Sequence, residues 1–373
     1  MKNILVVVLL GCSGSLRAQD TLSLSLLFTG DIMQHETQIT SAFDPTSGHY
    51  DYKPSFQYIK PVLSAPDLTI GNLEFTLAGP PYKGYPQFCA PDEILETLKD
   101  AGYDVLVTAN NHCVDRSKRG LERTIDMLDS VRILHTGTFK DTLDWLNDYP
   151  LIVEAKGFRL ALLNYTYGTN GLPVFAPNIV NRIDTTRIRL DIQKAKSKNP
   201  DAIIVFMHWG QEYQSMPNAF QKSVADFSFR HGAKIVIGSH PHVLQPMEWR
   251  KEQDQLVAYS LGNFVSAQYE RYRNGGAMVH IDLEKIIQRD GSSVVKMKEV
   301  RYSLEWVFRS PVGRRTYHIL PVNQFENDST VVNGKIARQT LRQFIEDSRS
   351  LYQKENKNVT EWRPPASETV KDR

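Results

Sequence analysis

The sequence contains very little cysteine, with three cysteines among 373 residues. Cys12, Cys89 and Cys113 are too few for a disulfide framework, although one bond between Cys89 and Cys113 is allowed in an oxidising compartment. The chain also lacks an excess of either charge, since 44 basic residues are balanced by 42 acidic ones. A net charge of +2 argues against nucleic acid or an anionic membrane surface as the partner. No apolar run approaches the ~20 residues that a membrane-spanning helix needs.

What the sequence does contain is the composition of a globular protein, with 41% hydrophobic and 23% charged residues. At 373 residues the chain is long enough for one large domain with an appendage, or for two domains. No internal repeat or long block of one charge divides it.

The N-terminus has the pattern of an export signal. Lys2 is followed by apolar residues at positions 4–10, about the length of a signal-peptide core and too short to span a bilayer. Two processing outcomes remain open. Cleavage before Cys12 would leave an acylated cysteine that holds the protein at a membrane, and cleavage after Ala18 would release a soluble protein. We therefore expect an exported protein, either periplasmic or extracellular, or lipid-anchored to the cell envelope.

Polar side chains that bind metals or transfer protons follow several apolar runs at the point where each run ends. The clearest case is the run 235–237, which a Gly-Ser break separates from His240 and His242. Strand ends are where open α/β sheets hold their ligands. Four of the ten histidines stand at such ends, which independent packing of each strand does not explain. The other residues at strand ends are Asp31, Asn72, Glu74, Asn111, His112, His208 and Asn263.

The apolar runs alternate with amphipathic helical spacing, which predicts a largely parallel sheet covered by helices on both faces. The runs 151–153 and 160–165 predict a hairpin within that pattern. From residue 277 the pattern changes and predicts antiparallel strands, followed by an amphipathic helix over 335–352. The polar residues after this helix are expected to fray. The antiparallel strands are expected at 278–283, 294–307 and 317–322.

Read in order along residues 22–270, the strand ends carry six motifs. They are Gly-Asp-Ile-Met (30–33), Gly-Asn-Leu-Glu (71–74), Ala-Asn-Asn-His-x-x-Asp (109–115), His-Trp-Gly-x-Glu-Tyr (208–213), Gly-x-His-Pro-His-Val-Leu-Gln-Pro (238–246) and Tyr-Ser-Leu-Gly-Asn-Phe (259–264). Together these motifs resemble the CapA family, which is associated with poly-γ-glutamate capsule synthesis and is similar to the calcineurin-like metallophosphoesterases. The resemblance implies an α/β fold, namely a two-sheet sandwich flanked by helices, with a metal centre at the carboxyl ends of the strands.

The resemblance also implies a domain organisation. Residues 1–20 would be a signal peptide or lipoprotein signal, and residues 21–285 a CapA-like metallophosphoesterase domain. Residues 286–373 would form a C-terminal extension, β-rich and helical, that contains the amphipathic helix and a disordered tail.

Carried over residue by residue, the resemblance implies a centre for one or two divalent ions. Glu74, or alternatively Asn72, would occupy the position of the bridging carboxylate, and Asn111 would bind through its amide oxygen. His112 would donate a proton to the leaving group without binding metal. The implied metal ligands are Asp31, Glu74, Asn111, His208, His240 and His242.

The chemistry of these residue types agrees with such a centre. Carboxylates and imidazoles together suit manganese, iron or zinc, whereas calcium prefers oxygen alone. Two such ions ~3.5–4 Å apart can activate a bridging water and stabilise an anionic transition state. One departure concerns the first ion, because Met33 stands where the phosphoesterase pattern has a histidine. His35 lies two residues farther on and is a poor geometric substitute on a strand.

Residues around these ligands have roles that the sequence leaves open. Asp115 either holds His112 in position, as a catalytic partner, or caps the helix that begins near residue 116. Cys113 follows His112 directly, so a thiol nucleophile is considered, although a small buried cysteine is the commoner case. The residues expected on the substrate side or at the rim of the site are Asn72, Glu212 and Asn263.

Two classes of function follow. The first is an exported metal-dependent hydrolase or transferase that acts on a phosphoester, amide or γ-glutamyl bond of an anionic cell-envelope or capsule polymer, or of its precursor. The second is a non-catalytic, metal-binding accessory subunit of a capsule-synthesis or export complex at the membrane. The retained residues at the strand ends favour the enzyme, whereas Met33 favours the accessory subunit.

Overall fold

The computed structural model describes residues 20–310 and 316–363. The predicted export signal, with Cys12 and the cleavage site after Ala18, lies outside these ranges, as do the last ten residues of the predicted frayed tail. The prediction that the chain frays directly after the helix is wrong for the described part of that tail, because Thr360 and Glu361 pair with the strand residues Arg301 and Tyr302. Among the described residues, no helix is both long enough and apolar enough to cross a membrane.

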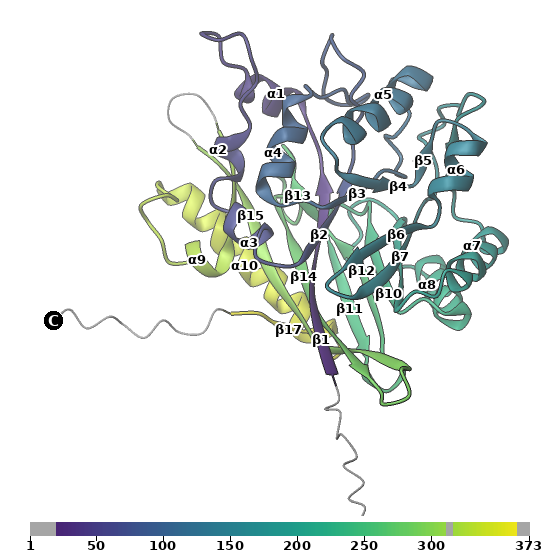
Figure 1. The fold of residues 1–373 in the computed structure, drawn as a ribbon. Helices are drawn as coiled ribbons and strands as arrows, with labels where there is room; N and C mark the ends of the chain where they lie inside the picture. The colour runs from purple at the N-terminus through teal and green to yellow at the C-terminus, as the bar shows by residue number, and fades with distance from the viewer. Residues whose placement is uncertain (1–19, 311–315, 364–373) are drawn as a thin grey trace, which may run out of the picture.

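The strands of the described residues form two large β-sheets and one small one (Figure 1). The first sheet runs, in spatial order, β16 (Tyr317–Pro321), β15 (Ser293–Arg309), β14 (Gly275–Ile287), β1 (Asp20–Ile32), β2 (Leu68–Leu73), β3 (Val105–Val107) and β4 (Leu134–Thr136), with β13 (Asn263–Val265) beside β1 and β17 (Thr360–Glu361) beside β15. The second runs β11 (Leu244–Arg250), β12 (Gln255–Leu261), β10 (Ile235–Ser239), β9 (Ala202–His208), β7 (Phe158–Thr166) and β6 (Leu151–Ala155). The small sheet pairs β5 (Thr138–Phe139) with β8 (Ile179–Val180).

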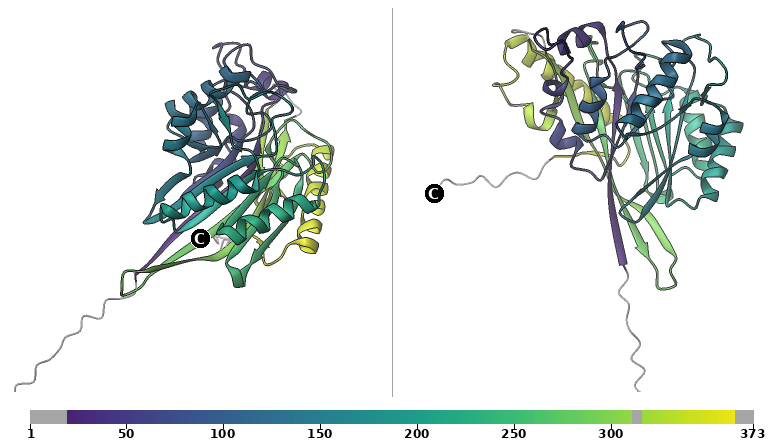
Figure 2. Two further views of the ribbon diagram at one scale, coloured as in Figure 1. Left: turned by 90° about the vertical axis from the view of Figure 1, so that its right-hand side faces the viewer. Right: turned by 45° about the horizontal axis from the view of Figure 1, so that its top comes forward.

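The expected α/β class and two-sheet sandwich are confirmed, but the prediction of one largely parallel sheet from the strand–helix alternation is wrong. The strands are divided between two sheets, and each sheet joins parallel strands to antiparallel ones. The predicted hairpin is present as the antiparallel pair β6 and β7. Each sheet has one face toward the other sheet and the other face toward helices, as the side view in Figure 2 shows.

A continuous apolar strand is buried on both of its faces in this arrangement. On β9, Ile204 and Phe206 belong to the core between the sheets, whereas Val205 and Met207 belong to the core beneath the helices. The outer face of the second sheet is covered by α7 (Thr185–Ser197) and α8 (Ala219–His231). The outer face of the first is covered by α1 (Glu36–Ala42), α2 (Lys53–Phe56), α3 (Lys60–Leu63) and α4 (Glu93–Ala101), while α5 (Ser117–Ser130) and α6 (Thr142–Asp148) pack beside β4 and β5.

The C-terminal part of the chain belongs to the same core. β15 pairs with β14 along its length, so the domain boundary predicted at residue 285 falls inside this hairpin. After β16 and α9 (Val322–Phe325), the amphipathic helix forms as α10 (Lys335–Glu355). Leu341, Phe344 and Ile345 of α10 join the core between the sheets. Because α10 contacts both β11 and β15, it closes one side of the sandwich.

Glu305 on β15 is a fully buried carboxyl, and neither of its oxygens has a hydrogen-bond partner among the described residues. Burial raises the pKa of Glu305 well above its usual value. A carboxyl whose pKa is higher in the folded than in the unfolded state makes the folded protein less stable as the pH rises above the unfolded pKa. We therefore expect the free energy of unfolding of wild type, relative to Glu305→Gln, to fall between pH 5 and pH 8.

Denaturant unfolding of both proteins at the two pH values measures this difference. The matched control is Glu96→Gln on the exposed side of α4, which should show no change relative to wild type. A difference for Glu305→Gln that stays constant with pH would contradict the prediction.

Candidate metal centre

The carboxyl ends of the parallel strands of both sheets meet at one end of the sandwich, the upper end in Figure 1. The imidazole rings of His208 and His240 lie 4.8 Å apart, and those of His240 and His242 5.9 Å apart, measured between centroids. Two groups of side chains there have ligand atoms within 4.8 Å of one another. One group is Asp31, Glu74 and His208, and the other is Glu212, His240 and His242.

Glu74 lies between these groups. Its Oε1 is 3.6 Å from Nε2 of His208 and 3.9 Å from Nε2 of His242. Asn111 joins the first group, because its Oδ1 is 2.9 Å from Nε2 of His208. Asp31 contacts the second, with Oδ2 3.2 Å from Nδ1 of His242. The structure therefore brings together every residue that the sequence proposed as a metal ligand.

The electrostatics of the site suit a bound cation. Burial, the neighbouring Asp31, Glu212 and Asp115 raise the pKa of Glu74 well above its usual value. Burial and the neighbouring imidazoles lower the pKa of His208 well below its usual value, and burial with His242 lowers that of His240 to about 3. Buried carboxyls that repel one another and imidazoles kept neutral are the donors that a divalent ion would stabilise.

Asp31 behaves differently. Burial opposes its ionisation, but hydrogen bonds from His242, from Asn72 and from the backbone of His240 outweigh burial, and its pKa is lowered. The site therefore holds at least one candidate ligand whose ionised form is favoured.

Two buried atoms in the site also fit a metal. Oε1 of Glu74 and Nδ1 of His240 have no hydrogen-bond partner among the described residues. Since buried polar atoms are nearly always paired, these two are candidates for binding an ion. The donor set is mixed oxygen and nitrogen, which fits manganese, iron or zinc.

Asn110 is a site residue that the sequence reasoning missed. Its amide nitrogen donates to the backbone oxygen of Leu73 at 2.7 Å and to Oδ1 of Asn72 at 3.1 Å, and its Oδ1 accepts from the backbone N–H of His112. These backbone contacts set the orientation of Asn110, which in turn sets that of Asn72. The Nδ2 of Asn72 then donates to Asp31 at 2.8 Å. Asn72 therefore orients a carboxylate, and its oxygen faces Asn110, so Glu74 is the better candidate for the bridging position.

Asn263 has a similar supporting role beneath His242. Its Nδ2 donates to the backbone oxygen of Arg273 at 2.9 Å, and its Oδ1 accepts from Nδ1 of His242 at 2.9 Å. This contact leaves Nε2 of His242 as the lone-pair donor that faces Glu74. We expected Asn72 and Asn263 at the rim, but both are fully buried, because each packs inside the site and hydrogen-bonds a candidate ligand, Asp31 or His242. Glu212 is exposed, as a rim residue should be.

His112 and Asp115 form a hydrogen-bonded pair beside the ligands. Nδ1 of His112 donates to Oδ2 of Asp115 at 2.7 Å, and the same oxygen accepts from the backbone N–H of Phe88 at 2.6 Å. Burial raises the pKa of Asp115, and the hydrogen bond from His112 partly offsets this effect. The helix that follows has Arg116 at its N-cap, so Asp115 is not the cap. Because Asp115 occupies Nδ1, Nε2 of His112 is the nitrogen that can exchange a proton.

The position of Met33 is filled by packing. Met33 is buried in the core beneath α1 to α4. His35 caps the start of α1, and its Nδ1 lies 3.2 Å from Oε1 of Gln38 and accepts from the backbone N–H of Ala267 at 3.3 Å. Burial lowers the pKa of His35 to about 4. Neither Met33 nor His35 belongs to the ligand groups found among the described residues.

The loop that carries the two histidines is held in a strained conformation. His240 and His242 have φ angles of +95° and +57°, in the left-handed region that non-glycine residues rarely adopt. The backbone N–H of Tyr213, itself at φ +64°, donates to the oxygen of Pro241 at 2.8 Å. Glycine is required just before, because a side chain on Gly238 would collide with the backbone oxygen of Tyr259. Such strain persists only where the surroundings enforce it, and it is common at functional sites.

Tyr167 is a second residue that the sequence reasoning missed. Its half-exposed ring lies 4.5 Å from that of His240 and is stacked on that of His208. The signal was present, since Tyr167 follows the apolar run 160–165 in the same way that the ligands follow theirs. Trp209, in contrast, is fully buried and donates to the backbone oxygen of Tyr259 at 2.9 Å, so it serves packing.

Cys89 and Cys113 are free and buried, which corrects the allowed disulfide. The thiol of Cys89 contacts the backbone oxygen of Gly79 instead. Burial raises the pKa of Cys113 to about 12, so the thiol stays protonated and is a poor nucleophile.

We expect neither Cys89 nor Cys113 to react with Ellman's reagent in the folded protein at pH 8, and both to react once guanidinium unfolds it. Mass spectrometry of unreduced peptides checks the same point. A peptide pair linked through these two cysteines would contradict it.

Comparisons with known proteins identify the family of this chain. Residues 25–268 match the family described as "Bacterial capsule synthesis protein PGA_cap". The chain belongs to this family. The resemblance to CapA proteins drawn from the six motifs is thereby confirmed.

Relatives of this PGA_cap protein include two from bacilli. It is 29% identical over 273 residues to the capsule biosynthesis protein CapA of Bacillus anthracis, covering 70% of this chain and 64% of that protein. It is 31% identical over 284 residues to the PGA biosynthesis protein CapA of Bacillus subtilis (strain 168), covering 70% of this chain and 68% of that protein. The chain thus spans less than two thirds of the length of the Bacillus anthracis relative.

Similar solved structures are more distant. The NAD nucleotidase of Haemophilus influenzae has a TM-score of 0.45 and 11% identity, covering 93% of this chain and 65% of that one. The calcineurin-like phosphoesterase YfkN from Bacillus subtilis has a TM-score of 0.44 and 15% identity, covering 90% of this chain and 100% of that one.

Proposed function

We propose that this PGA_cap protein is a metal-dependent hydrolase or transferase acting on an anionic polymer of the cell envelope or capsule, or on its precursor. The observation that carries the proposal is a division of tasks at the strand ends. A carboxylate–imidazole ligand set lies beside the His112–Asp115 pair, which is outside both ligand groups of the described residues. A metal with a purely structural role has no need of a polarised imidazole next to it.

The residues present can divide the chemistry as follows. Asp31, Glu74 and the three imidazoles would hold one or two ions of manganese, iron or zinc, which supply an activated water and stabilise an anionic transition state when bound. His112 would donate its Nε2 proton to the leaving group. Asp115 accepts a hydrogen bond from Nδ1 of His112 and keeps the ring in place.

The bond that is cleaved or transferred is proposed to be a phosphoester, an amide or a γ-glutamyl bond. The names of the two bacillus relatives concern capsule and PGA biosynthesis, which supports a capsule polymer as substrate and a capsule-synthesis complex at the membrane as partner. The test is metal analysis of the purified protein together with a hydrolysis screen on phosphodiesters and γ-glutamyl peptides, with His112→Ala as the matched inactive variant. Bound metal with no turnover of either class would overturn the catalytic proposal.

A second candidate function is a metal-binding accessory subunit of capsule synthesis or export. The observation in its favour is Met33, a core side chain where the phosphoesterase pattern has a ligand. Under this proposal the metal stabilises a binding surface, and replacing His112 has no effect on polymer production.

Export of the protein is part of the proposal and is tested separately. We expect mass spectrometry of the native protein to show a mature N-terminus at an acylated Cys12 or at Gln19, because residues 4–10 resemble a signal-peptide core. Recovery of the intact protein, with Met1 or Lys2, from the cytoplasm would count against it.

A further inference from the structure

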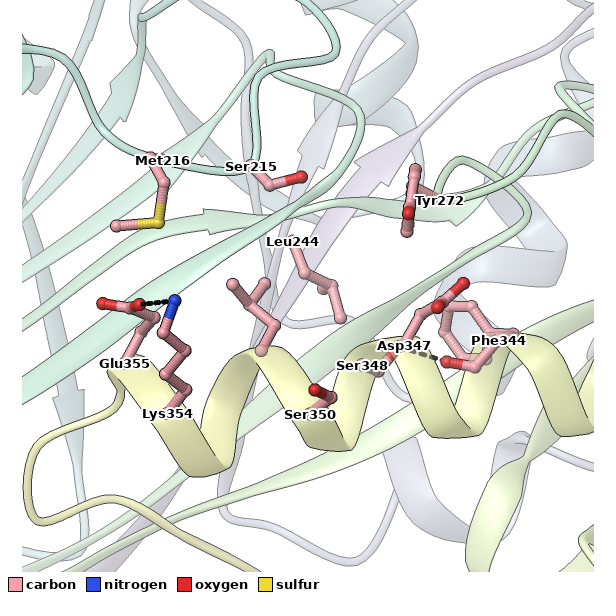
Figure 3. A pocket seen from close by; sticks show the side chains of 11 residues that line it. Ser215, Met216, Leu244, Tyr272, Phe344, Asp347, Ser348, Ser350, Lys354 and Glu355 are labelled. Carbon is pink, nitrogen blue, oxygen red and sulfur yellow. Dashed lines mark hydrogen bonds and ion pairs between the residues drawn. The ribbon is translucent and has the colours of Figure 1, made fainter.

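A pocket of about 380 Å³ lies between α10 and the loops that carry Ser215 and Tyr272 (Figure 3). In Figure 3, α10 runs along one side of the pocket, and Met216, Ser215 and Tyr272 lie across from it. Its volume is in the range of small-molecule sites. The apolar part of the lining is formed by Met216, Leu244, Tyr272, Phe344 and Leu351.

Three residues that line the pocket lie close in the sequence to residues of the metal centre or of its supporting contacts. Leu244 follows His242 by two residues, which span at most ~7 Å. Ser215 follows Glu212 by three, which span at most ~11 Å. Tyr272 precedes Arg273, whose backbone oxygen holds the amide of Asn263 beneath His242. Three segments of the chain therefore connect the metal centre directly to the lining of this pocket.

The charged residues of the lining are already paired within the protein. Nζ of Lys354 is 3.3 Å from Oε1 of Glu355. Asp347 accepts two hydrogen bonds from Arg271, at 2.7 and 2.8 Å. The hydroxyl of Ser348 donates to the backbone oxygen of Phe344 at 2.7 Å. Asp347 is thus held by Arg271, whereas the Lys354–Glu355 pair lies at the solvent-exposed edge of the pocket, with the Lys354 side chain 81% exposed.

We propose that this pocket binds an uncharged hydrocarbon portion of the substrate, while an anionic group of the same molecule is held at the metal centre. A charged group placed against Met216, Leu244 and Leu351 would lose hydration, whereas an apolar group would gain by covering this apolar surface. That surface is available, because Met216 is 47% exposed and Tyr272 46%. The anionic end of this assignment rests on the proposed function, and the hydrocarbon end rests on the pocket alone.

The experiment measures binding of n-alkyl phosphates from ethyl to octyl to the manganese-loaded protein by calorimetry. We expect the affinity to rise about three- to fourfold for each added methylene, which corresponds to ~0.8 kcal/mol per buried CH₂. Met216→Glu and Leu351→Glu place a charge in the pocket and should abolish this increase. The matched control is Ile336→Glu, which like Leu351→Glu changes a residue of α10. Ile336 is 82% exposed and lies outside the pocket lining, so this variant should retain the increase in affinity with chain length.

The outcomes separate this proposal from the catalytic one. Equal affinity of the wild-type protein for short and long alkyl phosphates would overturn the pocket assignment. This part of the test uses only the wild-type protein, so it does not depend on whether a variant folds. A chain-length effect without turnover of any phosphodiester or γ-glutamyl peptide would support the pocket and contradict the proposed catalysis. Displacement of octyl phosphate by a γ-glutamyl oligomer, lost in Met216→Glu, would also overturn it, because that occupant is anionic.

Discussion

Replacing His112 by alanine is expected to lower turnover by ~10²–10⁴-fold, the usual contribution of a general acid, while metal content and folding stay nearly unchanged. The reason is geometric. His112 contacts Asp115 through Nδ1 and lies outside both ligand groups of the described residues, so its loss removes a proton donor and no ligand. Single-turnover rates and metal analysis on the same preparation measure both quantities.

His240→Ala is the matched contrast, since it is also a histidine-to-alanine change at a strand end. We expect it to lose metal, because Nδ1 of His240 is buried without a partner among the described residues and is a candidate ligand. Should His112→Ala support full polymer production in cells while His240→Ala does not, the metal would be structural and the accessory function would be correct.

Replacing Glu74 by glutamine is expected to make the protein more stable than wild type without metal and less stable than wild type with metal. With a chelator present, the variant should melt at a higher temperature than wild type, because a fully buried carboxyl beside Asp31 is removed. With manganese at 100 times its dissociation constant, wild type gains ~2.7 kcal/mol through binding, and the variant should gain far less because a central ligand has lost its charge.

Thermal unfolding with chelator and with manganese measures this crossover. The control is again Glu96→Gln. Glu96 is an exposed carboxylate on α4 and is separated in the sequence from every candidate ligand, so this variant should respond to metal as wild type does. An equal gain from manganese in Glu74→Gln and wild type would show that Glu74 is not a ligand.

The candidate ligand set was predictable because it depends on strand ends. Apolar runs followed by Asp31, His208 or His240 identify where strands stop, and the carboxyl ends of parallel strands meet at one edge of a sheet. The role of Asn72 was not predictable. Whether its amide presents oxygen or nitrogen to the candidate ligands depends on its contact with Asn110, which is remote in the sequence. The backbone oxygen of Leu73 in turn fixes the orientation of Asn110.

Other assignments were also beyond the sequence. Asp115 stands one residue before the N-cap of α5, where a cap and a partner of His112 look the same in the sequence. Cys89 and Cys113 are compatible with a bond in sequence, but each is buried as a free thiol. The pocket beside α10 combines segments near residues 215, 244, 272 and 350, so no local pattern marks it.

The sequence by itself determined the strands, the helices and the chemical types at the strand ends, because periodicity and residue type act over a few neighbouring positions. Only the tertiary structure decided how the strands divide between two sheets. An apolar strand such as β9 buries both faces whether it lies between two layers of helices or between helices and a second sheet, so its sequence is the same in both cases. Which partner covers each face is set by long-range packing, and the orientation of the ligands follows from that packing.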